Sequence, residues 1–289
     1  MFQDILVSGL VNGGVYALLA IGFSLIFGVA RIVNIAHTAF YMLASYALYG
    51  LLVKAEFPLV VAIPLAIVSV VALSLVCYKL VIEPVRQHES AVLIATIALA
   101  LIFQESLLVS FGGSFLGIPA AVDGFTSVLG VRVSNQRLII LAVVAATLAA
   151  TWFLLYRTRL GLAIRASAND QEIANLMGMN VNRVAMLTVG ISVALAAIAG
   201  VVVAPVFVVD PLMWLSPLVT MLAIVVLGGL GSIKGSLIGA FIIGYVEAIT
   251  VFVVPSGAFL KGAVALSIMV IVLLIRPEGL FGVVFEEER

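Results

Sequence analysis

Long apolar stretches, separated by short polar connections, dominate the pattern of this chain. A helix needs about 20 mostly apolar residues to cross the hydrocarbon core of a membrane. Nine stretches come near that length, at residues 5–30, 35–53, 58–78, 91–111, 138–156, 183–208, 216–230, 235–254 and 258–275. The pattern predicts an all-α integral membrane protein, a polytopic helical bundle of about eight or nine transmembrane segments in one domain, residues 1–289.

Two of the nine stretches differ from the others. Residues 216–230 are short and end at glycines, and residues 35–53 begin beside the polar side chains of Asn34 and His37. Irregular backbone at membrane depth must be enclosed by protein or line a wet cavity, because lipid offers it no hydrogen-bond partner. These two stretches are the candidates for broken or re-entrant segments.

Two connections are longer than the rest. Residues 112–136 contain Gly112-Gly113 and Asp123-Gly124, turn chemistry that predicts an external loop. Residues 157–182 form the longest polar stretch. With this second connection inside, ten of the fourteen basic residues fall inside and four outside, as expected for cytoplasmic loops rich in lysine and arginine. The C-terminus is then cytoplasmic, and nine spans place the N-terminus outside.

The 157–182 connection carries a helix signal of its own. Asn169 or Asp170 can cap a short helix over residues 171–177, which Gly178 would end. Its apolar residues, Ile173, Leu176 and Met177, recur at helical spacing on one face. A cytoplasmic amphipathic helix of this kind is expected to dock against a partner.

Composition supports the membrane assignment and excludes several chemistries. Apolar residues make up 64% of the chain and charged residues 10%, against roughly half and a quarter in soluble domains. The 14 basic and 14 acidic residues balance, so charge gives no indication of nucleic-acid binding. The single cysteine, Cys77, permits no intrachain disulfide and no cysteine metal cluster. We expect no removable signal peptide, because no basic segment precedes the first apolar stretch.

Several segments resemble one known family. They are Gly9 with Tyr16-Ala17-Leu18, Asn34-Ile35-Ala36-His37, Arg165-Ala166-Ser167-Ala168-Asn169-Asp170 with Ile173-Ala174, Gly178-Met179-Asn180 with Arg183-Val184, the glycine-rich run 226–232 with Gly235 and Gly239, and the closing run 276–282. In this order they cover nearly the whole chain and resemble the branched-chain amino acid ABC-importer permeases of the LivH type. One departure is Thr38, since glycine commonly follows the Ala-His pair in that family.

The resemblance implies a multi-subunit importer in the bacterial cytoplasmic (inner) membrane. Two permease subunits would form the pathway, the second usually a related LivM-type chain, with two ATPase subunits beneath and a periplasmic solute-binding protein outside. The loop helix would dock on an ATPase subunit. The implied coupling residues are Arg165, Asn169, Asp170, Glu172, Ile173, Ala174, Leu176, Met177 and Gly178. Leucine-like amino acids, other amino acids, amides, urea and organic acids all remain open as solutes.

The glycine-rich segment after residue 228 invites comparison with a phosphate-binding loop. A P-loop requires Gly-Lys-Ser or Gly-Lys-Thr after a strand, whereas Lys234 precedes Gly235 here and apolar spans flank the segment. Gly231, Gly235 and Gly239 recur at every fourth residue, the small-residue spacing that lets membrane helices pack closely. We therefore expect helix packing rather than nucleotide binding.

Eight polar residues within or beside spans are candidates for the translocation pathway: Asn12, Tyr16, Asn34, His37, Thr96, Glu105, Thr220 and Glu247. Ionisable groups at membrane depth usually face a bundle interior or a water cavity. Glu105 or Glu247 would line an outer vestibule and bind a solute ammonium group, or each would be a structural carboxyl. His37 would fix a helix start by a hydrogen bond, or act as a gate. The other polar groups would contact solute or bond between helices.

The chain shows no sign of being an enzyme. No nucleophile, base and orienting acid occur together, and the two histidines, His37 and His88, lie in different segments, which argues against a metal site. No bound cofactor is expected. An ion-coupled secondary transporter is the alternative function, and it would favour midplane charges or repeated broken helices, which the sequence does not show.

Overall fold

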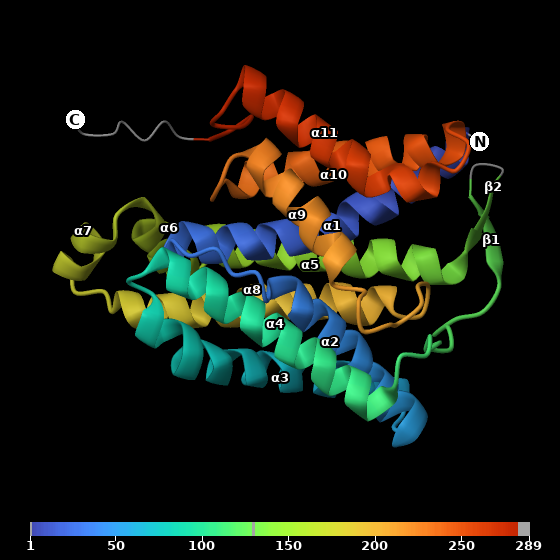
Figure 1. Ribbon diagram of the computed structural model, residues 1–289, viewed down its shortest axis with the longest axis horizontal. Coiled ribbons are helices and arrows are strands. Elements are labelled where there is room, and N and C mark those ends of the chain that lie inside the picture. Colours follow the sequence, from blue (N-terminus) through green and yellow to red (C-terminus); the bar gives the residue numbers. More distant parts are fainter. Residues whose placement is uncertain (1, 129–130, 283–289) are drawn as a thin grey trace.

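The computed structural model describes residues 2–128 and 131–282 as a bundle of helices lying side by side (Figure 1). Helix α1 (Phe2–Ala30) and helix α8 (Val181–Val203) pack against each other at its centre. On one side lie α9 (Leu215–Gly228), α10 (Ile233–Val253) and α11 (Gly257–Ile275), and on the other α2 (His37–Tyr49), α3 (Leu59–Cys77) and α4 (Glu89–Phe111). Helix α5 (Asn135–Arg157) packs beside α1.

The structure confirms the all-α membrane fold. Within the described residues, seven helices are long and apolar enough to cross a membrane: α1, α3 with its continuation to Val85, α4, α5, α8, α10 and α11. The continuation of α3 comprises a π-helical turn, Tyr78–Ile82, and a 3₁₀ turn, Glu83–Val85. The two remaining apolar stretches form shorter helices, α9 and α2, the latter extended by the π-helical turn Gly50–Lys54. Irregular backbone precedes both, at residues 31–36 and 204–214.

The 157–182 connection forms two helices rather than the one that the sequence predicts. Helix α6 (Arg159–Asn169) and helix α7 (Gln171–Leu176) meet at Asp170, which has an extended backbone. The Asp170 carboxylate accepts hydrogen bonds from the N–H groups of Glu172 and Ile173 at 2.8 and 2.9 Å, so Asp170 and not Asn169 caps α7. After α7, Gly178 takes a positive φ of 83°, a conformation that glycine adopts without a Cβ penalty.

Side-chain caps also begin three other helices at this end of the bundle, α6, α8 and α10. In each case the side-chain oxygen accepts a hydrogen bond from the backbone N–H three residues later. The capping residues are Thr158 for α6, Asn180 for α8 and Ser232 for α10. Polar residues therefore mark the starts of α6, α8 and α10, where the first backbone N–H groups of a helix have no partner within it.

The 112–136 connection contains an antiparallel hairpin that the turn chemistry did not predict. Strand β1 (Phe125–Val128) pairs with β2 (Val131–Ser134), with Phe125 opposite Ser134. The hairpin and the start of α1 lie at one end of the bundle, and α7 and the last turn of α11 lie at the other (Figure 1). The two ends of the described chain are thus on opposite faces, as an odd number of spans requires. Residues 283–289, including the C-terminus, lie outside the described residues.

Glycines allow α10 to approach its neighbours closely. A Cβ on Gly235 would collide with the Gly228 carbonyl of α9, and a Cβ on Gly239 would lie 3.0 Å from the Ile224 carbonyl oxygen. Gly231 does not share this helix face, because α10 begins only at Ile233. Gly231 lies in the preceding turn with a φ of 79° and packs against the end of α1. The prediction of one packing face for all three glycines is therefore wrong for Gly231.

Candidate functional site

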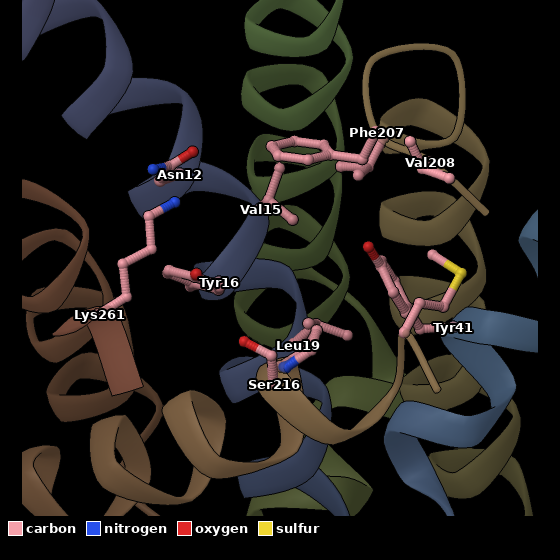
Figure 2. A pocket seen from close by; sticks show the side chains of 12 residues that line it. Asn12, Val15, Tyr16, Leu19, Tyr41, Phe207, Val208, Ser216 and Lys261 are labelled. Atoms are coloured by element: carbon pink, nitrogen blue, oxygen red, sulfur yellow. The ribbon is translucent and has the colours of Figure 1, made fainter. Parts of the chain in front are cut away.

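A cavity of about 200 Å³ lies inside the chain, toward the hairpin end. It is lined by the first half of α1, one residue of α2, the end of α8 with the segment that follows, and the starts of α9 and α11 (Figure 2). Its lining residues are Asn12, Val15, Tyr16, Leu19, Tyr41, Val203, Phe207, Val208, Met213, Ser216, Pro217 and Lys261. Irregular backbone in the 204–214 segment thus borders a cavity, in agreement with the rule for membrane interiors.

A buried carboxylate lies behind the cavity wall. Glu247 of α10 is 1% exposed. One of its oxygens accepts a hydrogen bond of 2.8 Å from the Tyr16 hydroxyl, and the other accepts one of 3.3 Å from the Thr220 hydroxyl. Tyr16 itself lines the cavity, as does Asn12 one helical turn earlier. Four of the eight pathway candidates, from α1, α9 and α10, are therefore brought together here.

Lys261 is a cavity residue that sequence reasoning missed. It lies in the first half of α11 and is half-buried. Figure 2 shows its side chain extending toward Asn12 and Tyr16. A second, adjoining cavity shares Asn12, Phe207 and Lys261 with the first and includes Arg137 of α5. The sequence feature that could have identified Lys261 is a single cation within an apolar span, which is uncommon unless the cation has a partner or faces water.

Three other candidates gather around the start of α2 and not at the cavity. Asn34, His37 and Thr96 are each at most 1% exposed. His37 Nε2 donates a hydrogen bond of 3.2 Å to the Leu19 carbonyl of α1, and its Nδ1 lies 3.5 Å from the Ser192 hydroxyl of α8. The Thr96 hydroxyl accepts a hydrogen bond from the backbone N–H of Ile35. This arrangement matches a structural hydrogen bond that fixes the helix start.

Replacing His37 by alanine should lower the stability of the protein by about 3 kcal/mol, because it removes a buried hydrogen bond and leaves a ring-sized void between α1, α2 and α8. Thermal unfolding in detergent measures the effect. His88 is exposed and provides the matched control, since His88→Ala should leave the unfolding temperature unchanged. Equal unfolding temperatures for His37→Ala and the parent protein would contradict the structural role.

Glu105 does not join the cavity. Its side chain is exposed on the outside of the bundle and accepts a hydrogen bond from Gln104, whose amide oxygen accepts another from the Trp214 ring N–H. The positions of Glu105 and Glu247 therefore do not support the same prediction for both residues. The two carboxylates lie at similar distances from helix ends, but they face opposite environments, which helical position alone does not reveal.

Helix α7 presents an apolar face outward. Ile173, Leu176 and Met177 are 58%, 86% and 77% exposed, whereas Ala174 is 2% exposed and packs inward. Glu172 and Asn169 are also exposed, and the guanidinium of Arg165 lies 4.9 Å from the centre of the Tyr156 ring. Ala174 belongs to the face that holds α7 on the bundle. The other three apolar residues form a separate face, named here the α7 apolar face: Ile173, Leu176 and Met177.

Two side-chain hydrogen bonds tie α6 and α7 to the end of α1. The Gln171 amide donates to the Val29 carbonyl at 2.6 Å, and the Arg31 guanidinium donates to the Ala168 carbonyl at 3.2 Å. Arg31 follows α1 with a positive φ of 57°. Since α1 also carries Asn12 and Tyr16, one continuous helix connects the α7 end of the bundle to the cavity.

A bundle of membrane-length helices with an internal, partly polar cavity and a projecting amphipathic helix at one end defines a membrane transport subunit. The family described as "Branched-chain amino acid transport system / permease component" matches residues 5–273, and this chain belongs to that family. The resemblance found in the sequence motifs is thereby confirmed.

Individual relatives cover almost the whole chain. The permease protein BraD of the high-affinity branched-chain amino acid transport system of Pseudomonas aeruginosa is 30% identical, over 96% of this chain and 94% of its own. LivH of Escherichia coli is 31% identical, over 97% and 96%. The ribose import permease RbsC of Escherichia coli is 34% identical, but over only 34% of this chain and 33% of its own.

A solved structure shares the fold. PsaBC from Streptococcus pneumoniae in complex with Fab superposes with a TM-score of 0.56, over 95% of this chain and 92% of that chain, at 16% sequence identity. This likeness concerns the helical architecture alone. The sequence relatives are transport permease proteins.

Proposed function

We propose that this chain is the permease subunit of an ABC importer that moves branched-chain amino acids, or related small polar solutes, into the cytoplasm. The similarity to BraD and LivH over nearly the full length supports this class of solute. The family membership lends no support to an ion-coupled secondary transporter. ATP hydrolysis takes place on separate ATPase subunits, and the chain itself is not an enzyme.

The observation that carries the mechanism is the α7 apolar face. A six-residue helix, capped by Asp170 and held to the bundle by Ala174, exposes Ile173, Leu176 and Met177 at one end of the molecule. Large apolar side chains gathered at an exposed site mark a protein contact. We assign this contact to an ATPase subunit, whose movement α7 passes to α1 through the Gln171 and Arg31 hydrogen bonds.

The partners follow from this assignment. The α7 end and the C-terminus lie in the cytoplasm, in a bacterial inner membrane, with connection 157–182 as the coupling loop. The opposite end carries the 112–136 external loop with its hairpin, which faces the periplasmic solute-binding protein. A second permease subunit of the related LivM type completes the pathway. The lysine and arginine distribution supports this orientation.

Reconstitution tests the proposal. The chain, co-expressed with the second permease and the two ATPase subunits, should co-purify with them and accumulate radiolabelled leucine in vesicles only when ATP is supplied. Deletion of residues 171–177 should abolish accumulation and release the ATPase. Full accumulation by vesicles that lack the ATPase subunits would overturn the proposal and favour coupling to an ion gradient.

A further inference from the structure

The cavity presents a cation, a hydroxyl backed by a buried carboxylate, and an apolar surface at one place. Lys261 supplies a cation and Tyr16 a hydroxyl bonded directly to the buried carboxylate of Glu247. Val15, Leu19 and Phe207 contribute apolar surface to the same cavity. Its volume of about 200 Å³ is below the roughly 300–1,000 Å³ of pockets for drug-sized ligands, so it suits one small solute.

Placing a charged pair inside a membrane protein is costly, and a hydrophobic pair of similar size is often at least as stable. Glu247 has two hydroxyl donors, Tyr16 and Thr220, and Lys261 lies on the wall of the cavity that Tyr16 also lines. Intramembrane ionisable groups that face a cavity commonly mark a solute path. The location of Lys261 on the cavity wall, rather than in direct contact with Glu247 behind it, leaves its ammonium available to a bound anion.

We propose that this cavity binds the solute as a zwitterion, an α-amino acid with an apolar side chain. The Lys261 ammonium binds the solute carboxylate. The Tyr16 oxygen accepts a hydrogen bond from the solute ammonium. The Tyr16 hydroxyl keeps its proton and donates a hydrogen bond to Glu247, whose negative charge balances the ammonium. The apolar wall contacts the solute side chain. The inference rests on the proposed function and gives it a binding site within a single permease chain.

This arrangement discriminates between the solutes that sequence reasoning left open. A zwitterion satisfies both charges at once, whereas an organic acid satisfies only Lys261 and meets the negative potential of Glu247. An uncharged solute such as urea leaves the charges of Lys261 and Glu247 both unpaired. Leaving a buried charge or polar partner unpaired is what makes a site selective. Glu247 acts here as a positioning residue, because Tyr16 and not Glu247 touches the solute.

The test uses the complete importer in lipid nanodiscs, without the solute-binding protein, and measures binding of radiolabelled L-leucine. Two competitors report the two charges separately: leucinamide lacks the carboxylate, and 4-methylvalerate lacks the ammonium. The parent protein should prefer leucine over both by at least about 10-fold. Lys261→Met should weaken the binding of leucine by at least about 10-fold and the binding of leucinamide by less than about twofold. Glu247→Gln should weaken the binding of leucine by a similar factor, and it should leave the binding of 4-methylvalerate unchanged or improve it.

Matched controls lie outside the cavity at the same end of the bundle. Lys54 is exposed, with its ammonium 4.1 Å from the centre of the Phe111 ring, and Glu105 is exposed on α4. Lys54→Met and Glu105→Gln should bind leucine like the parent protein. Lys261→Arg keeps the charge and should retain most of the binding, which separates loss of the cation from misfolding.

The outcomes separate the two proposals. An equal loss of leucine and leucinamide binding in Lys261→Met would show a structural role and overturn the zwitterion site. The absence of leucine binding in the parent protein, together with intact ATP-driven leucine uptake, would also overturn the site but leave the importer function standing. Failure of uptake in the complete system would count against the importer function itself.

Discussion

Replacing Leu176 by glutamate should reduce ATP-driven uptake by at least about 10-fold while the permease still folds and inserts. Leu176 is the most exposed residue of the α7 apolar face, at 86%, so the change costs the isolated chain almost nothing. In the complex the new carboxylate would be buried against an ATPase subunit without a partner, a penalty of several kcal/mol. Uptake into vesicles and the amount of ATPase subunit that co-purifies measure the effect.

The matched control introduces the same charge nearby. Gln87 is exposed in the turn before α4, outside the coupling loop but at the same end of the bundle, and Gln87→Glu should leave uptake and co-purification unchanged. Ala174→Asp does not serve the same purpose, because Ala174 is buried and a carboxylate there would detach α7 from the bundle. Normal coupling in Leu176→Glu would exclude the α7 apolar face as the ATPase contact.

Replacing Gly235 by alanine should destabilise the protein by about 3 kcal/mol, the upper part of the range for overpacked interiors. The added Cβ would collide with the Gly228 carbonyl, and both groups belong to the backbones of packed helices, so neither can rotate away. Separation of α9 from α10 would also disturb Thr220 and Glu247, which hydrogen-bond across the same pair of helices. The unfolding midpoint and the yield of monodisperse protein report the loss.

Gly262 provides the control for this change. It also lies within a helix, α11, but a Cβ there would meet nothing within 4 Å. Gly262→Ala should therefore leave the protein as stable as before or stabilise it by up to about 1 kcal/mol, the difference in helix propensity. Similar stability losses in Gly235→Ala and Gly262→Ala would refute close packing of α9 against α10 as the cause.

Local features of the sequence were sufficient to predict much of the fold. Each of the nine apolar stretches became a helix, because the length and polarity of a span are properties of consecutive residues. The short α7 was found from a cap and a stop signal, Asp170 and Gly178, that act within a few residues. Helix α6 and the β1–β2 hairpin were missed. Helix α6 is amphipathic and begins at the Thr158 cap, local signals that sequence reasoning did not use, and it packs against α1 and α8. The two strands of the hairpin are only four residues long.

For the candidate site, the sequence identified several of the residues but not their arrangement. Sequence reasoning found Tyr16, Thr220 and Glu247 separately, as polar groups within apolar spans. Their meeting around one carboxylate depends on how α1, α9 and α10 pack. The same reasoning treated Glu105 as equivalent to Glu247 and overlooked Lys261. Helix rotation about its own axis decides whether a residue faces inward, and these uniformly apolar helices carry little periodic signal for it.

The sequence by itself determined that this chain crosses the membrane many times, which residues can lie within the spans, and which family it belongs to. Those properties follow from hydrophobic length, local capping and short motifs. Only the tertiary structure decided which polar groups border one cavity, that His37 at the start of α2 hydrogen-bonds the Leu19 carbonyl of α1, and that Ala174 faces inward while Leu176 faces outward. Such assignments depend on contacts between helices distant in sequence, and in lipid those contacts arise from close packing and hydrogen bonds between side chains, which no single span encodes.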